Sequence, residues 1–445
     1  MSDTIAAFAT PPGIGGVAVL RVSGPDAGRI LRAVFSRDTP GRRLTYGRLV
    51  DPMSGETVDE CMAVLMRAPR TLTREDVAEI HCHGGPAVME RALRVVIRQG
   101  ARPAEPGEFT RRAFENGRID LAQAEAVTRL VGARGEAAAR AALRQLDGGA
   151  SRFVRDVSGG LVSMLAGIEA AIDFPDEVEE QETAARIADL SEELAHKLEA
   201  SSDQRAGRVL DDGLDVVIAG PPNAGKSSLL NALLSEDRAI VHESPGTTRD
   251  VLSAETTVSG MRVRLSDTAG LRGTEDPVEA IGVERALARI DHADLVLMVV
   301  DASIPMVWQM PEIPPERLAI LQNKSDLAVF ADKSFFDIDR IGLRVSAKTG
   351  EGLDAVRALI AERADALAPE SAILTGARHA RSALAAARSM REAAASLRDG
   401  KLGGAALDLA AIDLREALRE LSLVTGEDAS KSVIDQVFSK FCVGK

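Results

Sequence analysis

The stretch from Leu214 to Leu230, LDVVIAGPPNAGKSSLL, constrains this 445-residue chain more than any other. A short apolar run is followed by a turn of small residues and then by a segment with helical character. The turn fits the pattern G-x-x-x-x-G-K-[ST], with Gly220, Gly225, Lys226 and Ser227 at its defined positions. Backbone N–H groups and a helix N-terminus surround phosphate oxygens in such loops. The stretch therefore predicts a strand, a phosphate-binding loop and a helix, and a Gly-rich turn without function is the weaker alternative.

The chain around this stretch alternates strands and helices from residue 211 to about 370. The expected strands are Val216–Ala219, Val263–Ser266, Leu295–Val300, Ala319–Gln322 and Leu343–Ser346. This alternation is typical of a parallel sheet with helices on both faces. In the loop itself, Lys226 would reach the β- and γ-phosphates and the Ser227 hydroxyl would bind Mg²⁺.

Three further polar motifs follow expected strands. The carboxylate of Asp267-Thr-Ala-Gly270 can hold the hydration shell of Mg²⁺. In Asn323-Lys-Ser-Asp326, Asp326 can accept two hydrogen bonds from guanine, a pattern that adenine does not offer. Backbone N–H groups of Ser346-Ala-Lys348 can donate to the guanine carbonyl. Four motifs in this order predict a P-loop GTPase domain of the Ras-like fold.

Two positions depart from the pattern of small GTPases. Leu271 stands where Ras-like proteins carry a Gln that orients the attacking water, and a Leu side chain cannot form that hydrogen bond. Arg272, Glu275, Asp276 and Glu279 are the candidates to replace it. Asn223 lies in the phosphate loop, and with loop carbonyls it could hold a monovalent cation that supplies positive charge. A turn-forming role for Asn223 is the other interpretation.

The rest of the chain indicates two more domains. Residues 1–118 read as mixed α/β, whereas residues 119–210 and 371–445 are almost wholly helical. Because the ends of an inserted domain usually lie close together, we predict one discontinuous helical domain with the GTPase domain, residues 211–370, inserted into it. Three domains suit a chain of this length.

The charge balance argues against a broad surface for nucleic acid. The chain has 54 Lys and Arg against 67 Asp and Glu, a net charge of −13. Proteins that bind nucleic acid through a wide face are usually basic. One Trp, one Tyr and 11 Phe also leave few rings for base stacking. Any RNA contact is therefore expected at a local patch or through a partner, with weak affinity for this chain alone.

The sequence gives no sign of export or membrane insertion. It shows no signal peptide and no apolar run near the roughly 18 residues that span a membrane. Its three cysteines are too few for a disulfide framework. We expect a cytoplasmic protein without membrane contact, with Cys61 and Cys82 in the core.

Taken together, the motifs resemble the MnmE (TrmE) family of tRNA-modification GTPases, within the TrmE/Era/Der branch. In the GTPase region the resemblance rests on P-N-x-G-K-S, G-T-T-R-D, D-T-A-G-L-R and N-K-x-D. Outside it, the matching stretches are Thr10–Gly13, Leu20–Gly24, Glu79, His83–Pro86, Pro106–Thr110, Asp120–Glu125 and Phe441–Lys445. The resemblance therefore runs through essentially the whole chain.

The resemblance implies a function. Such proteins are homodimers that work with a flavin-dependent partner of the MnmG (GidA) type, in a heterotetramer or larger complex. Together they install an aminomethyl or carboxymethylaminomethyl group at carbon 5 of the wobble uridine of tRNA. GTP hydrolysis drives the reaction, and the implied one-carbon donor is a tetrahydrofolate, either 5-formyl- or methylene-tetrahydrofolate. The resemblance leaves open which tRNAs are modified and whether glycine or ammonium supplies the nitrogen.

The resemblance also implies a folate site and dimerisation in the N-terminal domain. The implied folate contacts are Arg21, Glu79, Arg118 and the C-terminal Lys445. Arginines suit the carboxylates of folate, and a carboxylate suits the N–H groups of its pterin. Without the resemblance, Arg21, Glu79 and Arg118 would be read as solvated surface charges.

For the GTPase domain, the resemblance implies potassium-dependent pairing across the nucleotide. The potassium ligands would be Asn223, His242, Ser244 and Thr247, and the Mg²⁺ ligands would be Ser227 and Thr248. Glu279 would be the catalytic residue that orients water, with Lys226 acting on the phosphates. The implied GTP contacts are Asn223, Ala224, Gly225, Lys226, Ser227, Ser228, His242, Glu243, Ser244, Pro245, Gly246, Thr247, Thr248, Asp267, Thr268, Ala269, Gly270, Asn323, Lys324, Asp326, Ser346, Ala347 and Lys348.

Cys442 has two interpretations of equal weight. Its thiolate, near Lys440 and Lys445, could act in the modification chemistry. Alternatively, the C-terminal tail packs beside the folate pocket and the thiol has no chemical role.

A ribosome-assembly GTPase of the Era/Der kind is the alternative function. Such a protein would need a basic KH-like C-terminal domain or a second GTPase domain. The tail has no G-x-x-G loop in a basic setting, and the chain has one phosphate loop. A structural dimer with a degenerate nucleotide site conflicts with the intact set of Lys226, Ser227, Thr248 and Asp267.

Overall fold

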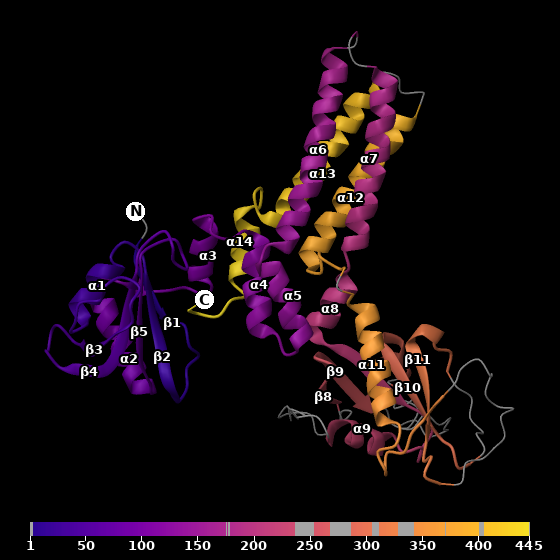
Figure 1. The fold of residues 1–445 in the computed structure, drawn as a ribbon, viewed down its shortest axis with the longest axis horizontal. Helices are drawn as coiled ribbons and strands as arrows, with labels where there is room; N and C mark the ends of the chain where they lie inside the picture. The colour runs from indigo at the N-terminus through magenta and orange to yellow at the C-terminus, as the bar shows by residue number, and fades with distance from the viewer. Residues whose placement is uncertain are drawn as a thin grey trace. The chain divides into compact units, whose positions relative to one another are not determined.

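The computed structural model of the protein describes residues 3–174, 176, 179–235, 253–267, 286–304, 311–327, 342–369, 371–399 and 405–444. The chain divides into two compact units (Figure 1). The first comprises residues 1–131, 145–195 and 385–445, and the second comprises residues 132–144 and 196–384. The predicted boundaries of three domains stay predictions.

The first unit contains a sheet of strands ordered β3-β4-β5-β2-β1-β6. Neighbouring strands are antiparallel except β1 and β6, which are parallel. The strands are β1 (Ile5–Phe8), β2 (Gly15–Ser23), β3 (Thr45–Val50), β4 (Thr57–Met66), β5 (Val77–Gly84) and β6 (Arg102–Pro103). Helices α1 (Ala27–Val34) and α2 (Pro86–Arg98) pack their apolar faces against the sheet in one core cluster. This confirms the mixed α/β prediction for the N-terminal region.

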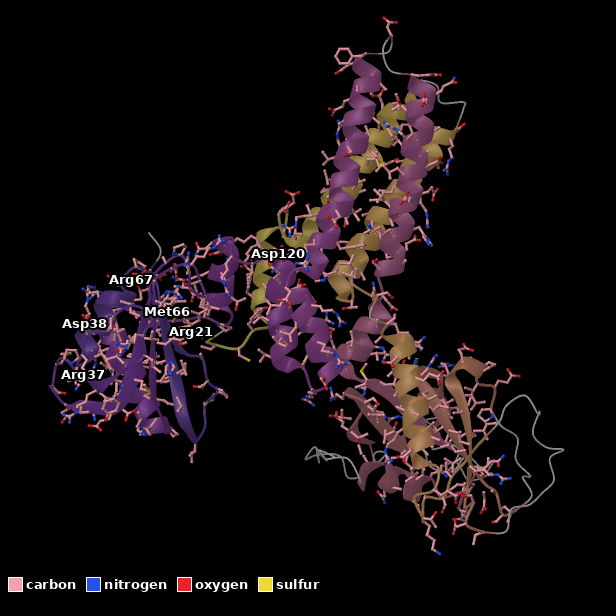
Figure 2. All side chains as sticks on the ribbon, viewed as in Figure 1. Arg21, Arg37, Asp38, Met66, Arg67 and Asp120 are labelled. Atoms are coloured by element: carbon pink, nitrogen blue, oxygen red, sulfur yellow. The ribbon has the colours of Figure 1, made fainter. Side chains whose placement is uncertain are left out.

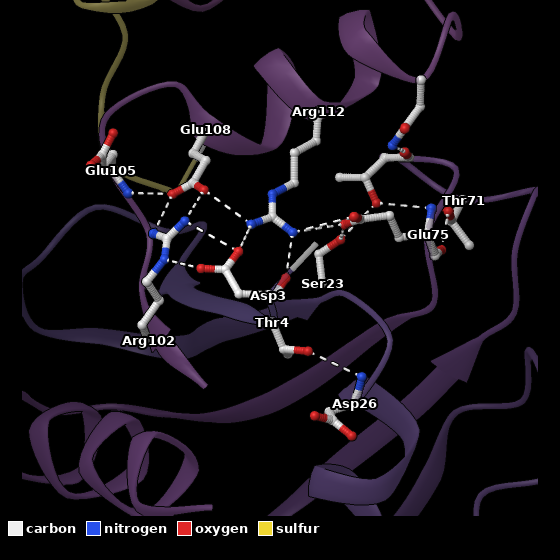
Figure 3. Close-up of polar contacts among 12 residues, drawn as sticks. Asp3, Thr4, Ser23, Asp26, Thr71, Glu75, Arg102, Glu105, Glu108 and Arg112 are labelled. Atoms are coloured by element: carbon white, nitrogen blue, oxygen red, sulfur yellow. Dashed lines mark hydrogen bonds and ion pairs between the residues drawn. The ribbon is translucent and has the colours of Figure 1, made fainter. Parts of the chain in front are cut away.

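A partly buried polar network fixes the next helix, α3 (Glu108–Glu115), to this sheet (Figure 3). The Arg112 guanidinium donates to the Asp3 carboxylate at 2.7 Å, to Glu108 at 3.1 Å and to Glu75 at 3.2 Å. Arg102 donates to the same Glu108 carboxylate at 2.5 Å. Since Arg112 is buried, these carboxylates supply the partners that water no longer provides.

The other helices of the first unit form a bundle. α6 (Gly149–Asp173) packs along α13 (Ala405–Thr425), and α7 (Glu180–Ser201) and α12 (Ala377–Arg398) lie beside them (Figure 1). Arg398 on α12 forms an ion pair with Asp189 on α7 at 2.8 Å. The remaining helices of this unit are α4 (Leu121–Gly132) and α14 (Lys431–Phe438), whereas most of α5 (Glu136–Leu146) belongs to the second unit. The predicted helical character of both flanking stretches is confirmed.

The second unit contains a sheet ordered β12-β11-β10-β7-β9-β8. Its strands are β7 (Leu214–Ala219), β8 (Ser253–Val258), β9 (Met261–Asp267), β10 (Leu295–Asp301), β11 (Leu318–Asn323) and β12 (Leu343–Arg344). α8 (Gln204–Asp212), α9 (Lys226–Ser235) and α11 (Leu353–Leu367) accompany them, with a short 3₁₀ turn at Pro315–Arg317. Alternate residues of β7 and β10 enter two separate apolar clusters, so the sheet is covered on both faces.

The five predicted strands of this region are present, with two differences. β12 ends at Arg344 rather than Ser346, since the Ser346 N–H donates to the Glu351 carbonyl oxygen at 2.9 Å and not to β11. β8 was not predicted, and it pairs antiparallel with β9. Its turn consists of Ser259 and Gly260, both at positive φ, which is the geometry of tight two-residue hairpins.

In the part of the chain that the structure describes, no helix is both long and apolar enough to cross a membrane. The predicted cytoplasmic location stays a prediction.

Candidate functional site

The phosphate loop lies between β7 and α9, and its glycines are required by geometry. Gly220 has φ +146°, and a Cβ there would come within 2.1 Å of the Val299 carbonyl oxygen. A Cβ on Gly225, at φ +93°, would lie 2.2 Å from Asn323 Nδ2. Asn223 also adopts the left-handed conformation, at φ 61°. The loop therefore reaches its shape only because two positions have no side chain.

Lys226, the first residue of α9, folds back over this loop. Its Nζ donates to the Pro221 carbonyl oxygen at 3.0 Å, and only 8% of the residue is exposed. Burial lowers the pKa of Lys226, while the charge of Asp267 opposes this change. A bound phosphate group would restore the stabilisation that the ammonium loses on leaving water. The loop thus offers an anion site with a partly desolvated cation beside it.

Ser227 and Asp267 meet beside the phosphate loop and suit a magnesium ion. Ser227 Oγ donates to Asp267 Oδ2 at 2.5 Å. The other carboxylate oxygen, Asp267 Oδ1, is buried without a hydrogen-bond partner within the described ranges. Hydroxyl and carboxylate oxygens are ligands that Mg²⁺ prefers, directly or through its water shell. An unsatisfied oxygen at this place therefore fits a hydrated cation.

Asn323 joins three of the predicted motifs through one buried side chain. Its Nδ2 donates to the Ala224 carbonyl oxygen in the phosphate loop at 2.8 Å. Its Oδ1 accepts from the Ala347 N–H at 3.1 Å. The structure thus brings N-K-S-D, S-A-K and the phosphate loop together, although more than a hundred residues separate the outermost two.

Asp326 and Lys324 are each held by a neighbour. Asp326 Oδ1 accepts from the Ser346 hydroxyl at 2.7 Å. Lys324, at φ 64°, places its Nζ 2.5 Å from Asp301 Oδ2. Burial raises the pKa of Asp301, but hydrogen bonds from Lys324 and Ser303 outweigh it and hold that pKa below its usual value. Sequence reasoning missed Asp301, although its place at the end of the apolar strand LVLMVVD was a usable signal.

The other predicted nucleotide-site residues lie outside the described residues. They are the catalytic Glu279 with its rivals Arg272, Glu275 and Asp276, then His242, Glu243, Ser244, Pro245, Gly246, Thr247, Thr248, Thr268, Ala269 and Gly270. Ser228 and Lys348 are described and lie within the α9 and S-A-K segments. The roles of all predicted site residues stay predictions.

Arg21 and Glu79, two predicted folate contacts, form a cross-strand pair in the first unit. They are register partners on β2 and β5, and Arg21 Nε donates to Glu79 Oε1 at 2.9 Å. The Arg21 guanidinium, whose residue is labelled in Figure 2, also lies over the Phe109 ring, 5.7 Å from the ring centroid. His81 Nε2 lies 3.4 Å from Glu79 Oε2. The pair is therefore a partly buried ion pair rather than two solvated charges.

The C-terminal tail docks beside this pair. Val443 forms a bridge with Pro106, and the Gly107 N–H donates to the Cys442 carbonyl oxygen at 3.3 Å. Gly444, at φ +93°, packs so closely that a Cβ would lie 1.9 Å from the Phe8 carbonyl oxygen. Its own carbonyl oxygen accepts from Arg21 at 3.5 Å. This agrees with the packing interpretation of the tail, while the exposed Cys442 thiol keeps its chemical role as a prediction and Lys445 lies outside the described residues.

Arg118, the third predicted folate contact, lies apart from that pair. Its guanidinium donates to the Leu72 carbonyl oxygen at 2.8 Å, and it lines a cavity of about 430 Å³. Leu72 and Phe109 belong to one small apolar cluster, so Arg118 and Arg21 border the same cluster. No hydrogen bond or ion pair joins Arg118 to Glu79 among the described residues.

Cys61 and Cys82 are core residues, as predicted. They are 4% and 2% exposed. Burial raises the pKa of Cys61 to about 12 and that of Cys82 to about 11, so both remain thiols at neutral pH.

The covered sheet, the phosphate loop and the guanine-type motif define a P-loop GTPase. The sequence matches the model for the MnmE helical domain over residues 121–442 and the model for the GTP-binding protein TrmE N-terminus over residues 4–118. It is 44% identical to the tRNA modification GTPase MnmE of Geobacter metallireducens over 460 residues, which covers 100% of both chains. Identity to the tRNA modification GTPase MnmE of Moorella thermoacetica is 43% over 467 residues, again with 100% of both chains. The chain belongs to the MnmE family of tRNA modification GTPases, and the predicted GTP hydrolase is confirmed.

A solved structure, the G domain of the FeoB iron transporter of T. maritima, is also similar. Identity is 23%, with 34% of this chain and 98% of that chain covered and a TM-score of 0.24. At that TM-score the likeness supports no argument about function.

Proposed function

We propose that this protein hydrolyses GTP in order to drive the modification of carbon 5 of the wobble uridine of tRNA. The group installed would be aminomethyl or carboxymethylaminomethyl, and a flavin-dependent partner of the MnmG type would share the reaction. The observation that carries the nucleotide part is Asn323, whose one side chain ties the phosphate loop to both base-binding motifs. The tRNA part rests on relatives named tRNA modification GTPase that match the full chain.

Four of the described nucleotide-site residues, Lys226, Ser227, Asp267 and Asp326, have defined roles in this proposal. Lys226 neutralises the β- and γ-phosphates, and its lowered pKa would rise when they bind. Ser227 and Asp267 hold Mg²⁺, which supplies positive charge to the phosphate oxygens when bound. Asp326, once released from Ser346, accepts hydrogen bonds from guanine, so adenine would leave a carboxylate unpaired.

Hydrolysis would also need a monovalent cation and a residue that orients water. We propose potassium at Asn223 with His242, Ser244 and Thr247, in a pair of GTPase domains that face each other. A positive charge there would take the place of an arginine finger. Glu279 would position the water, because Leu271 has no hydrogen-bonding group.

The N-terminal region would bind a tetrahydrofolate and hold two copies of the chain together. Arg21 and Glu79 fit such a ligand, since together they offer a donor fork and an acceptor at one partly buried place. Binding would require Arg21 to exchange its Gly444 contact or to share it with the ligand. Folate would supply the one-carbon unit, and these residues would only bind and orient it.

The test is reconstitution with an MnmG-type partner, a folate, GTP and an unmodified tRNA transcript, followed by mass spectrometry of the nucleosides. We expect a new wobble uridine derivative with the wild type. Lys226→Ala should abolish both GTP turnover and product. The matched control is Lys431→Ala, on the exposed first turn of α14, which should leave both unchanged. Product formation without GTP hydrolysis, or GTP hydrolysis without product, would contradict the proposal.

A further inference from the structure

Two arginine-rich loops meet at one end of the β3–β4 ladder. Residues 36–44 lead into β3, and residues 67–76 leave β4. Because Thr45 at the start of β3 pairs with Ala63 near the end of β4, both loops lie at the same end of these strands. The Arg42 N–H donates to the Leu65 carbonyl oxygen at 2.9 Å, and its guanidinium donates to the Arg70 carbonyl oxygen. The two loops are therefore in contact through Arg42.

In these loops the exposed Arg74 donates to the Asn116 carbonyl oxygen at 2.8 Å. The other four exposed arginines without an ion pair within the described ranges are Arg37, Arg42, Arg43 and Arg70. We call them the arginine patch. Elsewhere in the first unit, Arg29, Arg91 and Arg94 each contact a carboxylate, while Arg32, Arg118 and Arg152 are exposed singly and donate to backbone carbonyl oxygens. Within the two loops, Arg67 is paired with Asp76 and Glu75 is paired with Arg112 of α3, which leaves Asp38 as the other acid in the loops that carry the four arginines. Positive charge is thus concentrated here, in a chain whose net charge is −13.

Arg42 also occupies a backbone conformation that does not suit an arginine. It lies at φ 61° in the turn that the Arg43 N–H closes on the Pro40 carbonyl oxygen at 3.1 Å. A non-glycine residue in the left-handed region costs about 1–2 kcal/mol, which glycine would avoid. Strained positions of this kind tend to serve a function. Arg42 thus stands at this position at a conformational cost, and its contact with the Arg70 carbonyl oxygen is the role that the structure shows.

We propose that the arginine patch binds the phosphate backbone of tRNA. This inference rests on the proposed function, which makes tRNA the substrate. Guanidinium groups match phosphate oxygens in geometry and charge. A protein partner would need an apolar centre to its interface, whereas Leu44, 41% exposed, is the single large exposed apolar side chain within the described loops 36–44 and 67–76. Contacts to phosphate carry no sequence information, so the patch positions tRNA rather than selecting it.

The test measures binding of a fluorescent tRNA transcript to the full-length protein, by anisotropy between 50 and 200 mM KCl. The patch variant combines Arg37→Ala, Arg43→Ala and Arg70→Ala. Each phosphate contact adds about 0.7–0.9 to the slope of log K against log salt. We expect the patch variant to lose about 2–3 from that slope and about 10- to 100-fold in affinity at low salt. Its GTP turnover should equal that of the wild type.

A matched control combines Arg29→Ala, Arg91→Ala and Arg94→Ala, which removes the same charge from paired arginines of the same unit. It should stay within about twofold of the wild type in affinity, because these groups are already neutralised. Arg42→Gly guards against misfolding, because the relief of the left-handed backbone offsets the lost contact with Arg70, so the melting temperature should stay near that of the wild type while tRNA affinity falls.

An equal loss in the patch variant and the control would overturn the inference, because net charge alone would then explain binding. Unchanged tRNA affinity would overturn it as well, and so would loss of binding to the flavoprotein partner alone. These outcomes are independent of the proposed function, which fails if the wild type with its partner does not modify tRNA or modifies it without GTP hydrolysis. A patch variant with normal GTP turnover but reduced tRNA affinity supports the inference.

Discussion

Asn323 carries more of the nucleotide site than its place in a short motif suggests. Its amide contacts the phosphate loop on one side and the S-A-K loop on the other, and only 2% of the residue is exposed. Loss of this side chain would leave a carbonyl oxygen and an N–H group without a buried partner. Such unsatisfied groups cost about 1–3 kcal/mol each.

Asn323→Ala should therefore weaken GTP binding by about 10-fold or more and lower the melting temperature. Isothermal titration with a non-hydrolysable GTP analogue measures the first effect. Ser325→Ala is the control, because the hydrogen bond that the Ser325 hydroxyl makes among the described residues goes to the exposed Glu351, at 3.2 Å. Equal affinities for the Asn323 variant and the wild type would show that the three motifs hold together without it.

Lys226 provides a test by pH. Burial lowers the pKa of Lys226 in the free protein, so between that lowered pKa and the usual value of 10.5 the folded state binds fewer protons than the unfolded state. Stability of the free protein should rise with pH across this window, and Lys226→Met should lack that rise. Bound nucleotide should raise the pKa of Lys226, as followed by NMR of its side-chain nitrogen. A pKa that stays constant on nucleotide addition would contradict the anion site.

At the scale of elements, the network around α3 makes stability depend on pH at the acid end. Burial raises the pKa of Glu108, but hydrogen bonds from Arg102, the Glu105 N–H and Arg112 outweigh it and lower that pKa below 4.5. The stabilisation is thus present above the unfolded pKa and is lost as pH falls through the lowered one. Glu108→Gln should destabilise the first unit at pH 7 by about 1–3 kcal/mol and flatten this acid dependence. Urea unfolding at pH 7 and pH 4 measures both, and the same dependence in the variant would contradict it.

Two glycines give opposite predictions for the same change. Gly159, exposed within α6 with open space around its Cβ position, should tolerate alanine and gain about 0.5–1 kcal/mol of stability. Gly220→Ala should cost about 2–5 kcal/mol, since its Cβ would meet the Val299 carbonyl oxygen at 2.1 Å. Thermal unfolding of both variants gives the comparison. Equal melting temperatures would show that the phosphate loop can shift to admit a side chain.

Much of the nucleotide fold could be predicted because its signals are local. Apolar runs, glycines and polar residues at strand ends lie next to one another in the sequence, as in the stretch from Gly220 to Ser227. The ion pair between Arg21 and Glu79 could not be derived from spacing, because it depends on the register of β2 with β5 across 58 residues. The docking of Gly444 on Phe8 likewise depends on packing between the two ends of the chain. The hairpin at Ser259 and Gly260 was a local signal that was missed.

At the scale of the whole molecule, net charge and local charge lead to different expectations for RNA binding. A value of −13 indicates weak affinity for RNA overall, whereas the arginine patch concentrates positive charge at one end of a single sheet. We therefore expect tRNA to bind through a small area, with affinity that falls as salt rises. We also expect GTP hydrolysis to require two facing GTPase domains, since the cation site is proposed to be complete only in that pair.

The most direct measurement is GTP turnover in potassium and in sodium at equal ionic strength, for the wild type, Glu279→Ala and Glu275→Ala. We predict that potassium stimulates GTP turnover at least about 10-fold. In GTPases that use an arginine finger, positive charge at the transferred phosphate has a large effect on the rate of hydrolysis. The stimulation should disappear in Glu279→Ala, which should still bind nucleotide, and should persist in Glu275→Ala. Equal rates in the two salts for the wild type would contradict the cation site at Asn223 and, with it, the proposed mechanism of hydrolysis.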